Sequence, residues 1–212
     1  MGTSVRKTTA KIKKLLKDTV DTNPNVEPDE IIPDVANQTI KSKKAKAYFG
    51  DKDFAVLTGG GMSCFSRIAS GGYERFYHDF DVDKENLTAI DIQKIIEAIL
   101  DEIEKENGDI QSSFILNAFK TAMTKALLES ITNPIDFLTI FCEIFLTMII
   151  REAACEEILS QFKSAEPVSV DESIASFAKN YVHTNLSSCI KDCVTKGADI
   201  QTLIQSLQNC LR

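Results

Sequence analysis

The chain has 212 residues, 43% of them hydrophobic, and a formal net charge of −7 at pH 7. This length and apolar share allow one domain with a sizeable core and exclude a disordered chain. The charge is unevenly spread: residues 1–46 hold ten Lys and Arg against six Asp and Glu, a net charge of +4, whereas the remainder holds 14 against 25, a net charge of −11. A basic head on an acidic body indicates that the two ends meet different partners, or that the head docks on the body of a neighbouring copy.

The first 20 residues do not resemble a secretory signal, because they contain basic residues but no apolar core of about 7–15 residues. We therefore expect a protein that is not secreted by a signal peptide, and that is either intracellular (cytoplasmic) or assembled inside a cell into a virion. The six cysteines are then expected to be reduced thiols.

The N-terminal arm contains two basic segments. In residues 4–18, Ile12, Leu15 and Leu16 make an apolar stripe that lysines surround. The segment could dock on its own body, bind a neighbouring subunit or nucleic-acid phosphates, or lie on a membrane surface, although it lacks the Trp or Phe usual there. Across both segments, the candidate partner-binding residues are Arg6, Lys7, Lys11, Ile12, Lys13, Lys14, Leu15, Leu16, Lys41, Lys43, Lys44 and Lys46.

Residues 19–40 separate the two basic segments and hold three of the five prolines. This spacing predicts an extended linker that could reach about 60–70 Å. We therefore divide the chain into a basic arm with a Pro-rich linker, residues 1–46, and a helical domain, residues 47–212.

Residues 50–87 hold six of the nine glycines and a run of aromatic residues. Phe54–Leu57 is the only plausible strand, which argues against a sheet. We predict a structured, irregular loop region pinned by its aromatic side chains, followed by a helical bundle over residues 88–212.

Helix signals begin at Thr88, which forms a predicted capping box with Asp91. An apolar face then recurs at helical spacing from Ile92 to Ile103, and Asn107-Gly108 is a typical helix end. Asp109 is predicted to open the next helix, which ends before Asn133.

The stretch from Asn133 to Phe162 predicts a central helix with Asn133 as its N-cap. Its polar positions fall on one narrow stripe and the rest of its circumference is apolar; the stripe comprises Asp136, Thr139, Glu143, Thr147 and Arg151. The apolar run of 16 residues would span only about 24 Å, against about 30 Å for a bilayer core, so no transmembrane span is expected.

Two further helices are predicted after the central one. The first follows a capping box at Ser169 and Glu172 and ends at Gly197, and the second starts at Asp199. The fold class is therefore all-α: a bundle of about five helices around a central apolar helix at residues 134–162, with an irregular Gly/aromatic loop region and an extended N-terminal arm.

Candidate catalytic, cofactor and metal motifs are weak. The glycines at 59–61 lack both a G-K-[ST] sequence and a G-x-G-x-x-G fingerprint. Asp79, Asp81 and Asp83 do not continue into a calcium loop. Cys189 and Cys193 lack C-x-x-C spacing, so core packing is favoured over a zinc site with His183 and Cys210. We predict no cofactor and no metal.

The leading hypothesis is a non-enzymatic structural or adaptor subunit of a larger assembly, such as a virus or phage particle, attached to neighbouring subunits through its arm. We expect it to be an oligomer. One alternative is a nucleic-acid-binding module that uses the basic segments 6–17 and 41–46. The other is an enzyme with a site in region 59–83, where Ser63, Cys64, His78 and acidic residues would line a pocket.

Overall fold

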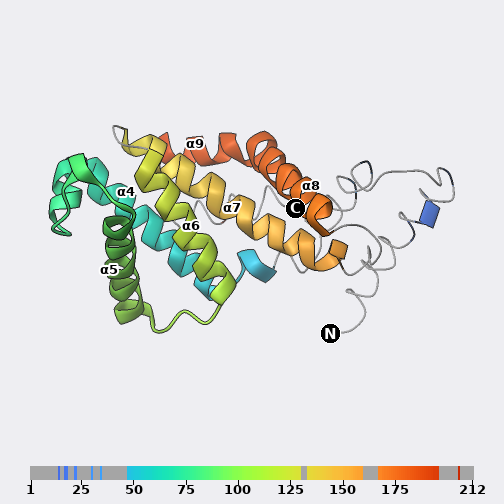
Figure 1. The fold of residues 1–212 in the computed structure, drawn as a ribbon, viewed down its shortest axis with the longest axis horizontal. Coiled ribbons are helices and arrows are strands. Elements are labelled where there is room, and N and C mark those ends of the chain that lie inside the picture. Colours follow the sequence, from blue (N-terminus) through green and yellow to red (C-terminus); the bar gives the residue numbers. More distant parts are fainter. Residues whose placement is uncertain are drawn as a thin grey trace. The chain divides into compact units, whose positions relative to one another are not determined.

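The structure, a computed structural model, describes residues 47–129, 133–159 and 167–195, and the single positions 14, 17, 18, 22, 30, 34 and 205. The described residues form an all-α helical bundle, as the sequence predicts (Figure 1). The elements are α4 (Lys52–His78), the 3-10 helix η1 (Lys84–Asn86), α5 (Ala89–Asn107), α6 (Ser113–Glu129), α7 (Pro134–Leu159), α8 (Pro167–Tyr181), the π-helix η2 (Val182–Leu186) and α9 (Ser187–Thr195).

The chain divides into two compact units. One unit comprises residues 51–145 with 187–206, and it therefore contains α4, α5, α6, the first half of α7 and α9. The other comprises residues 1–50, 146–186 and 207–212, and it contains the second half of α7, α8 and η2.

The predicted loop over residues 50–87 is wrong, because most of this region is the 27-residue helix α4. Asp51 caps the helix by accepting the backbone N–H of Asp53 at 2.8 Å. The glycines lie where α4 meets its neighbours: a Cβ at Gly60 would collide with Ile103, and a Cβ at Gly61 would collide with the ring of Phe141. Each glycine costs about 1 kcal/mol of helix propensity. Close packing against other helices offsets that cost, so tertiary structure overrides the local preference.

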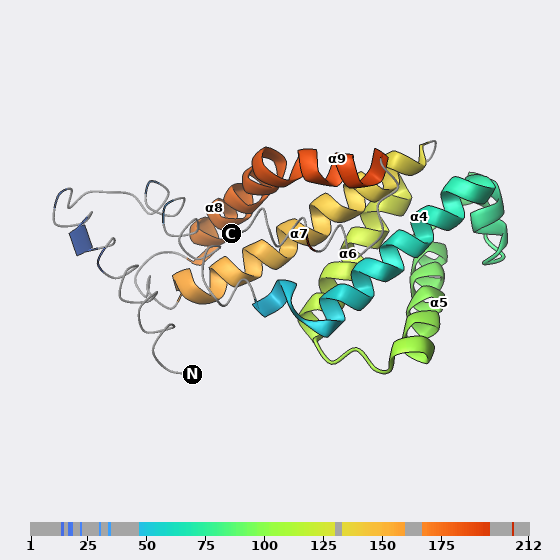
Figure 2. The ribbon, with the colours of Figure 1, turned by 180° about the vertical axis from the view of Figure 1, so that it is seen from behind.

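Helix α4 kinks at Gly72, whose backbone (φ 76°, ψ 167°) only glycine adopts readily. Figure 2 shows the carboxyl end of α4 turning away from the rest of the helix. Beyond the kink, Tyr77 is buried and its hydroxyl donates to the carbonyl of Leu127 at 3.1 Å. The kink thereby brings the end of α4 onto α6.

Helix α5 follows its prediction closely. Thr88 and Asp91 form the capping box, the isoleucine face is buried, and Gly108 ends the helix with φ 82°. Helix α6, in contrast, begins at Ser113 and not at Asp109. Ser112 is its cap, because its hydroxyl accepts the backbone N–H of Ile115 at 3.3 Å. Each of α4, α5 and α6 packs against the other two.

Helix α7 begins where predicted, with the Asn133 side chain accepting the backbone N–H of Ile135 at 3.0 Å. In its first half, Phe137, Phe141 and Phe145 are fully buried. The ring of Phe145 stacks on Phe54 of α4, with 5.4 Å between ring centroids. The predicted polar stripe is half-buried to exposed. Within the described part of the chain, no helix is long and apolar enough to cross a membrane.

The single helix predicted after Ser169 is divided in the structure. Helix α8 begins at Pro167, two residues before the predicted cap, and proline is favoured at a first helical position. The π-helix η2 then separates α8 from α9. Gly197 and the predicted helix from Asp199 lie outside the described residues, apart from the helical Gln205.

The described positions of the N-terminal arm are helical and exposed; they are Lys14, Lys17, Asp18, Thr22, Glu30 and Asp34. The prediction of an extended backbone is therefore wrong at the last three of these positions. Proline is tolerated in the first turn of a helix, so a segment that contains prolines need not be extended throughout.

Candidate functional site

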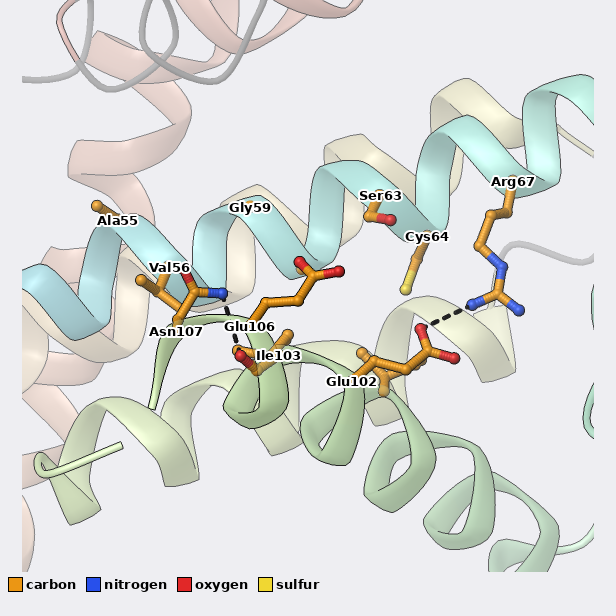
Figure 3. A pocket seen from close by; sticks show the side chains of 12 residues that line it. Ala55, Val56, Gly59, Ser63, Cys64, Arg67, Glu102, Ile103, Glu106 and Asn107 are labelled. Carbon is orange, nitrogen blue, oxygen red and sulfur yellow. Dashed lines mark hydrogen bonds and ion pairs between the residues drawn. The ribbon is translucent and has the colours of Figure 1, made fainter. Parts of the chain in front are cut away.

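A groove with a volume of about 390 Å³ lies between α4 and α5 (Figure 3). It lies wholly within the unit that holds residues 51–145. Its lining comes from the first two thirds of α4 and the second half of α5, and consists of Ala55, Val56, Gly59, Gly60, Ser63, Cys64, Arg67, Ile99, Glu102, Ile103, Glu106 and Asn107. The volume is in the lower range of protein ligand sites.

The lining of the groove contains both polar and apolar side chains. Ile99 and Ile103 belong to the buried face of α5. On α4, the half-buried Gly59 brings backbone to the groove, and Ala55 adds only a methyl group. An apolar side chain that entered the groove would therefore meet aliphatic carbon on α5 and backbone on α4.

One end of the groove is closed by Arg67, whose guanidinium lies 3.2 Å from the carboxylate of Glu102 and 3.8 Å from that of Asp79. The same guanidinium stacks over the ring of Phe80, 4.8 Å from its centroid. Two carboxylates and an aromatic face hold Arg67 in place. Its positive charge is already matched, and it therefore adds little free positive charge to the groove.

The other end of the groove is formed by Glu106 and Asn107. The Lys52 ammonium donates to the carbonyl of Asn107 at 2.7 Å, and the Asn107 amide donates to the carbonyl of Ile103 at 3.0 Å. The Glu106 side chain extends from α5 towards α4 (Figure 3). Glu106 makes no ion pair with any residue that the structure describes. This end therefore presents an unmatched carboxylate to the groove.

Cys64 points from α4 towards α5 and is only 1% exposed (Figure 3). Burial raises the pKa of its thiol to about 12, so the group is protonated at neutral pH. A nucleophilic cysteine needs the thiolate. Ser63 lies beside Cys64, but His78 does not line the groove. The groove therefore does not bring together the Cys64 and His78 pair that the hydrolase alternative requires.

Two of the acidic residues after α4, Asp79 and Asp83, have structural partners. Asp79 pairs with Arg67. Asp83 accepts the backbone N–H of Glu85 at 3.0 Å and the amide of Asn86 at 2.7 Å, which caps η1 and holds the pKa of the Asp83 carboxyl below its ordinary value. Among the described residues, no group of three or more His, Cys, Asp or Glu side chains is placed to hold a metal ion.

The predicted partner-binding residues of the arm lie outside the described residues, with the exception of Lys14, which is exposed. Sequence reasoning missed Glu102 and Glu106. A signal for them was present: they stand four residues apart and therefore share one face of α5. That this face borders a groove depends on the packing of α4, which the loop prediction had hidden.

Comparison of the chain with protein-family models, with curated proteins and with solved structures gives no match. The candidate function therefore depends on the residues and the geometry alone.

Proposed function

We propose that this chain is a non-enzymatic structural or adaptor subunit of a larger protein assembly, and that it attaches to neighbouring copies through its basic N-terminal arm. The observation that carries the proposal is the opposition of charge between the arm, at +4, and the body, at −11. Opposite charges on two surfaces speed and orient association.

Helix α5 carries part of the acidic charge of the body. This helix contains six acidic residues against two lysines. Its exposed acidic positions are Glu97, Asp101, Glu102 and Glu106. An exposed acidic helix supports the proposal because it offers the arm a complementary surface. Virus and phage particles are assemblies whose subunits have this anatomy, an analogy of architecture alone.

The nucleic-acid alternative uses the same basic segments, residues 6–17 and 41–46. It predicts binding that weakens steeply as salt rises, because each neutralised phosphate releases counterions. The acidic body argues against it, since α5 would repel a phosphate backbone that approached it.

The test is the mass of the full chain in solution, measured by light scattering across a range of protein concentrations. We expect a concentration-dependent oligomer. Reversing three arm charges with Lys11→Glu, Lys13→Glu and Lys14→Glu should shift it towards monomer.

The matched control reverses three exposed lysines of the body that do not lie on α5, with Lys120→Glu, Lys179→Glu and Lys191→Glu. It makes the same change in net charge and should leave assembly nearly unchanged. A chain that is monomeric at every concentration would contradict the proposal, as would equal effects of the arm and body variants.

A further inference from the structure

We infer that the groove between α4 and α5 is the receiving site for residues 6–17 of a second copy of this chain. The inference rests on the proposed function, and it names the surface that the arm would bind. Its evidence is the match between the lining of the groove and the residue pattern of that segment.

The side chains that line the groove match those of residues 6–17 in their chemistry. Val56, Ile99 and Ile103 contribute aliphatic carbon to the lining of the groove, and Glu102 and Glu106 contribute a carboxylate rim. A groove of this kind recognises an amphipathic helix that has a narrow apolar stripe and basic flanks. Residues 6–17 have this pattern, with Ile12, Leu15 and Leu16 surrounded by lysines.

The second point is the direction of the charges. At about 100° per residue, Lys11 and Lys13 lie about 100° to either side of Ile12 on a helix. Lys14 and Lys17 lie towards the face opposite Ile12. Lys14 and Lys17 are helical and exposed in the structure. Lys11 and Lys13 are therefore the lysines that would meet the carboxylate rim while the apolar stripe enters the groove.

The third point is length. The α4 wall runs from Ala55 to Arg67, which is about 18 Å at 1.5 Å per residue. A helix of residues 6–17 would be about 17 Å long by the same rise. The segment therefore fits the groove without an overhang that would need a further surface.

The fourth point is the unmatched charge of Glu106. Arg67 neutralises Glu102 at one end of the groove, but Glu106 has no ion-pair partner among the described residues. An incoming lysine at that end would pair with Glu106 without breaking a described ion pair. Lys11 or Lys13 of the arriving segment supplies that cation.

The test measures self-association of the full chain by sedimentation velocity. Ser63→Phe places a ring in the groove from an exposed position of α4, and Glu106→Lys reverses the unmatched charge. We expect each to weaken self-association about fivefold or more, the size of one lost ion pair or apolar contact. Their matched controls are Ser66→Phe and Asp101→Lys, which alter exposed positions of the same helices outside the groove and should change it less than about twofold.

A second comparison is made within the arm. The Lys11→Glu, Lys13→Glu pair should weaken self-association more than the Lys14→Glu, Lys17→Glu pair, although both change the net charge equally. Combining Glu106→Lys with the Lys11→Glu, Lys13→Glu pair should restore part of the loss. Circular dichroism of each variant confirms that the helices are intact.

The outcomes separate the inference from the proposed function. If the arm variants weaken assembly but Ser63→Phe and Ser66→Phe behave alike, the arm grips another surface and the inference is overturned. If neither arm nor groove variants change the mass, the proposed function itself has failed. If a labelled peptide of residues 4–18 binds at the groove while the full chain stays monomeric, the occupant is the chain's own arm. The assignment to a second copy is then wrong.

Discussion

The carboxylate of Asp53, in the first turn of α4, accepts the backbone N–H of Ser112 at 2.7 Å. The same oxygen accepts the N–H of Gln111 at 2.9 Å, and Asp53 is buried. These N–H groups lie just before α6, where no helical carbonyl is available to them. One buried side chain therefore joins the starts of two helices that are almost 60 residues apart in sequence.

Replacing Asp53 should destabilise the protein. Asp53→Ala leaves two backbone N–H groups without their acceptor, and we expect a loss of about 2–3 kcal/mol in the free energy of unfolding. Asp53→Asn keeps one acceptor oxygen and should lose less. Urea denaturation measures both. Asp101→Ala, at an exposed position, is the control and should stay within about 0.5 kcal/mol of the wild type. Equal stabilities of Asp53→Ala and Asp101→Ala would show that the contact is not stabilising.

The contact between Gly61 and Phe141 predicts an unusual response to alanine. Glycine to alanine normally stabilises a helix by about 0.5–1 kcal/mol. At Gly61 the added methyl group would collide with the buried ring of Phe141, so we expect Gly61→Ala to destabilise by about 1–3 kcal/mol. Thermal and urea unfolding measure the change. At Gly71 the new methyl would meet only the flexible side chain of Arg75, and Gly71→Ala should be nearly neutral.

The double variant Gly61→Ala, Phe141→Leu provides a check on the cause. A smaller side chain at position 141 should relieve the collision, so the two changes together should cost less than their separate effects added. Strict additivity would contradict the close approach of α4 and α7 at this point.

Cys64 should be unreactive in the folded protein. With a pKa of about 12, it holds on the order of a thousandfold less thiolate at pH 8 than a free cysteine, and burial further restricts access to it. We expect iodoacetamide to label Cys64 only after unfolding, as read by peptide mass spectrometry with and without urea. The buried Cys142 should behave in the same way. Rapid labelling of Cys64 in the native state would instead favour the enzyme alternative.

The capping box at the start of α5 predicts a dependence of stability on acid. Hydrogen bonds from the side chain and the backbone of Thr88 hold the pKa of Asp91 below its ordinary value of 3.8. Because the pKa is lower in the folded state, the stabilisation is present above pH 3.8 and is lost as the pH falls through the folded pKa. Asp91→Asn should therefore be less stable than the wild type at pH 7 and approach it near pH 2.

Urea denaturation at the two pH values measures this difference. Asp101→Asn removes a charge from an exposed position of the same helix and serves as the control, with no comparable change between the two pH values. A difference between Asp91→Asn and the wild type that is unchanged at low pH would show that the Asp91 charge does not contribute through the cap.

The amino-acid sequence by itself determined the all-α class, the start of α5 at Thr88, its end at Gly108 and the start of α7 at Asn133. These features depend on residues within a few positions of one another, because a cap or a left-handed glycine acts on the adjacent turn. The buried faces of α5 and α7 were readable for a similar reason, since helical periodicity is a local pattern.

Only the tertiary structure decided the helical state of residues 52–78, the start of α6 and the groove. Glycines 59–61 disfavour a helix locally, and the gain that overrides them comes from Ile103 and Phe141 on other helices. The start of α6 depends on Asp53, far away in sequence. The groove exists only where α4 and α5 lie side by side, so the position of Glu106 at the groove could not be read from its neighbours in sequence. Long-range packing sets these features, and local sequence patterns do not encode it.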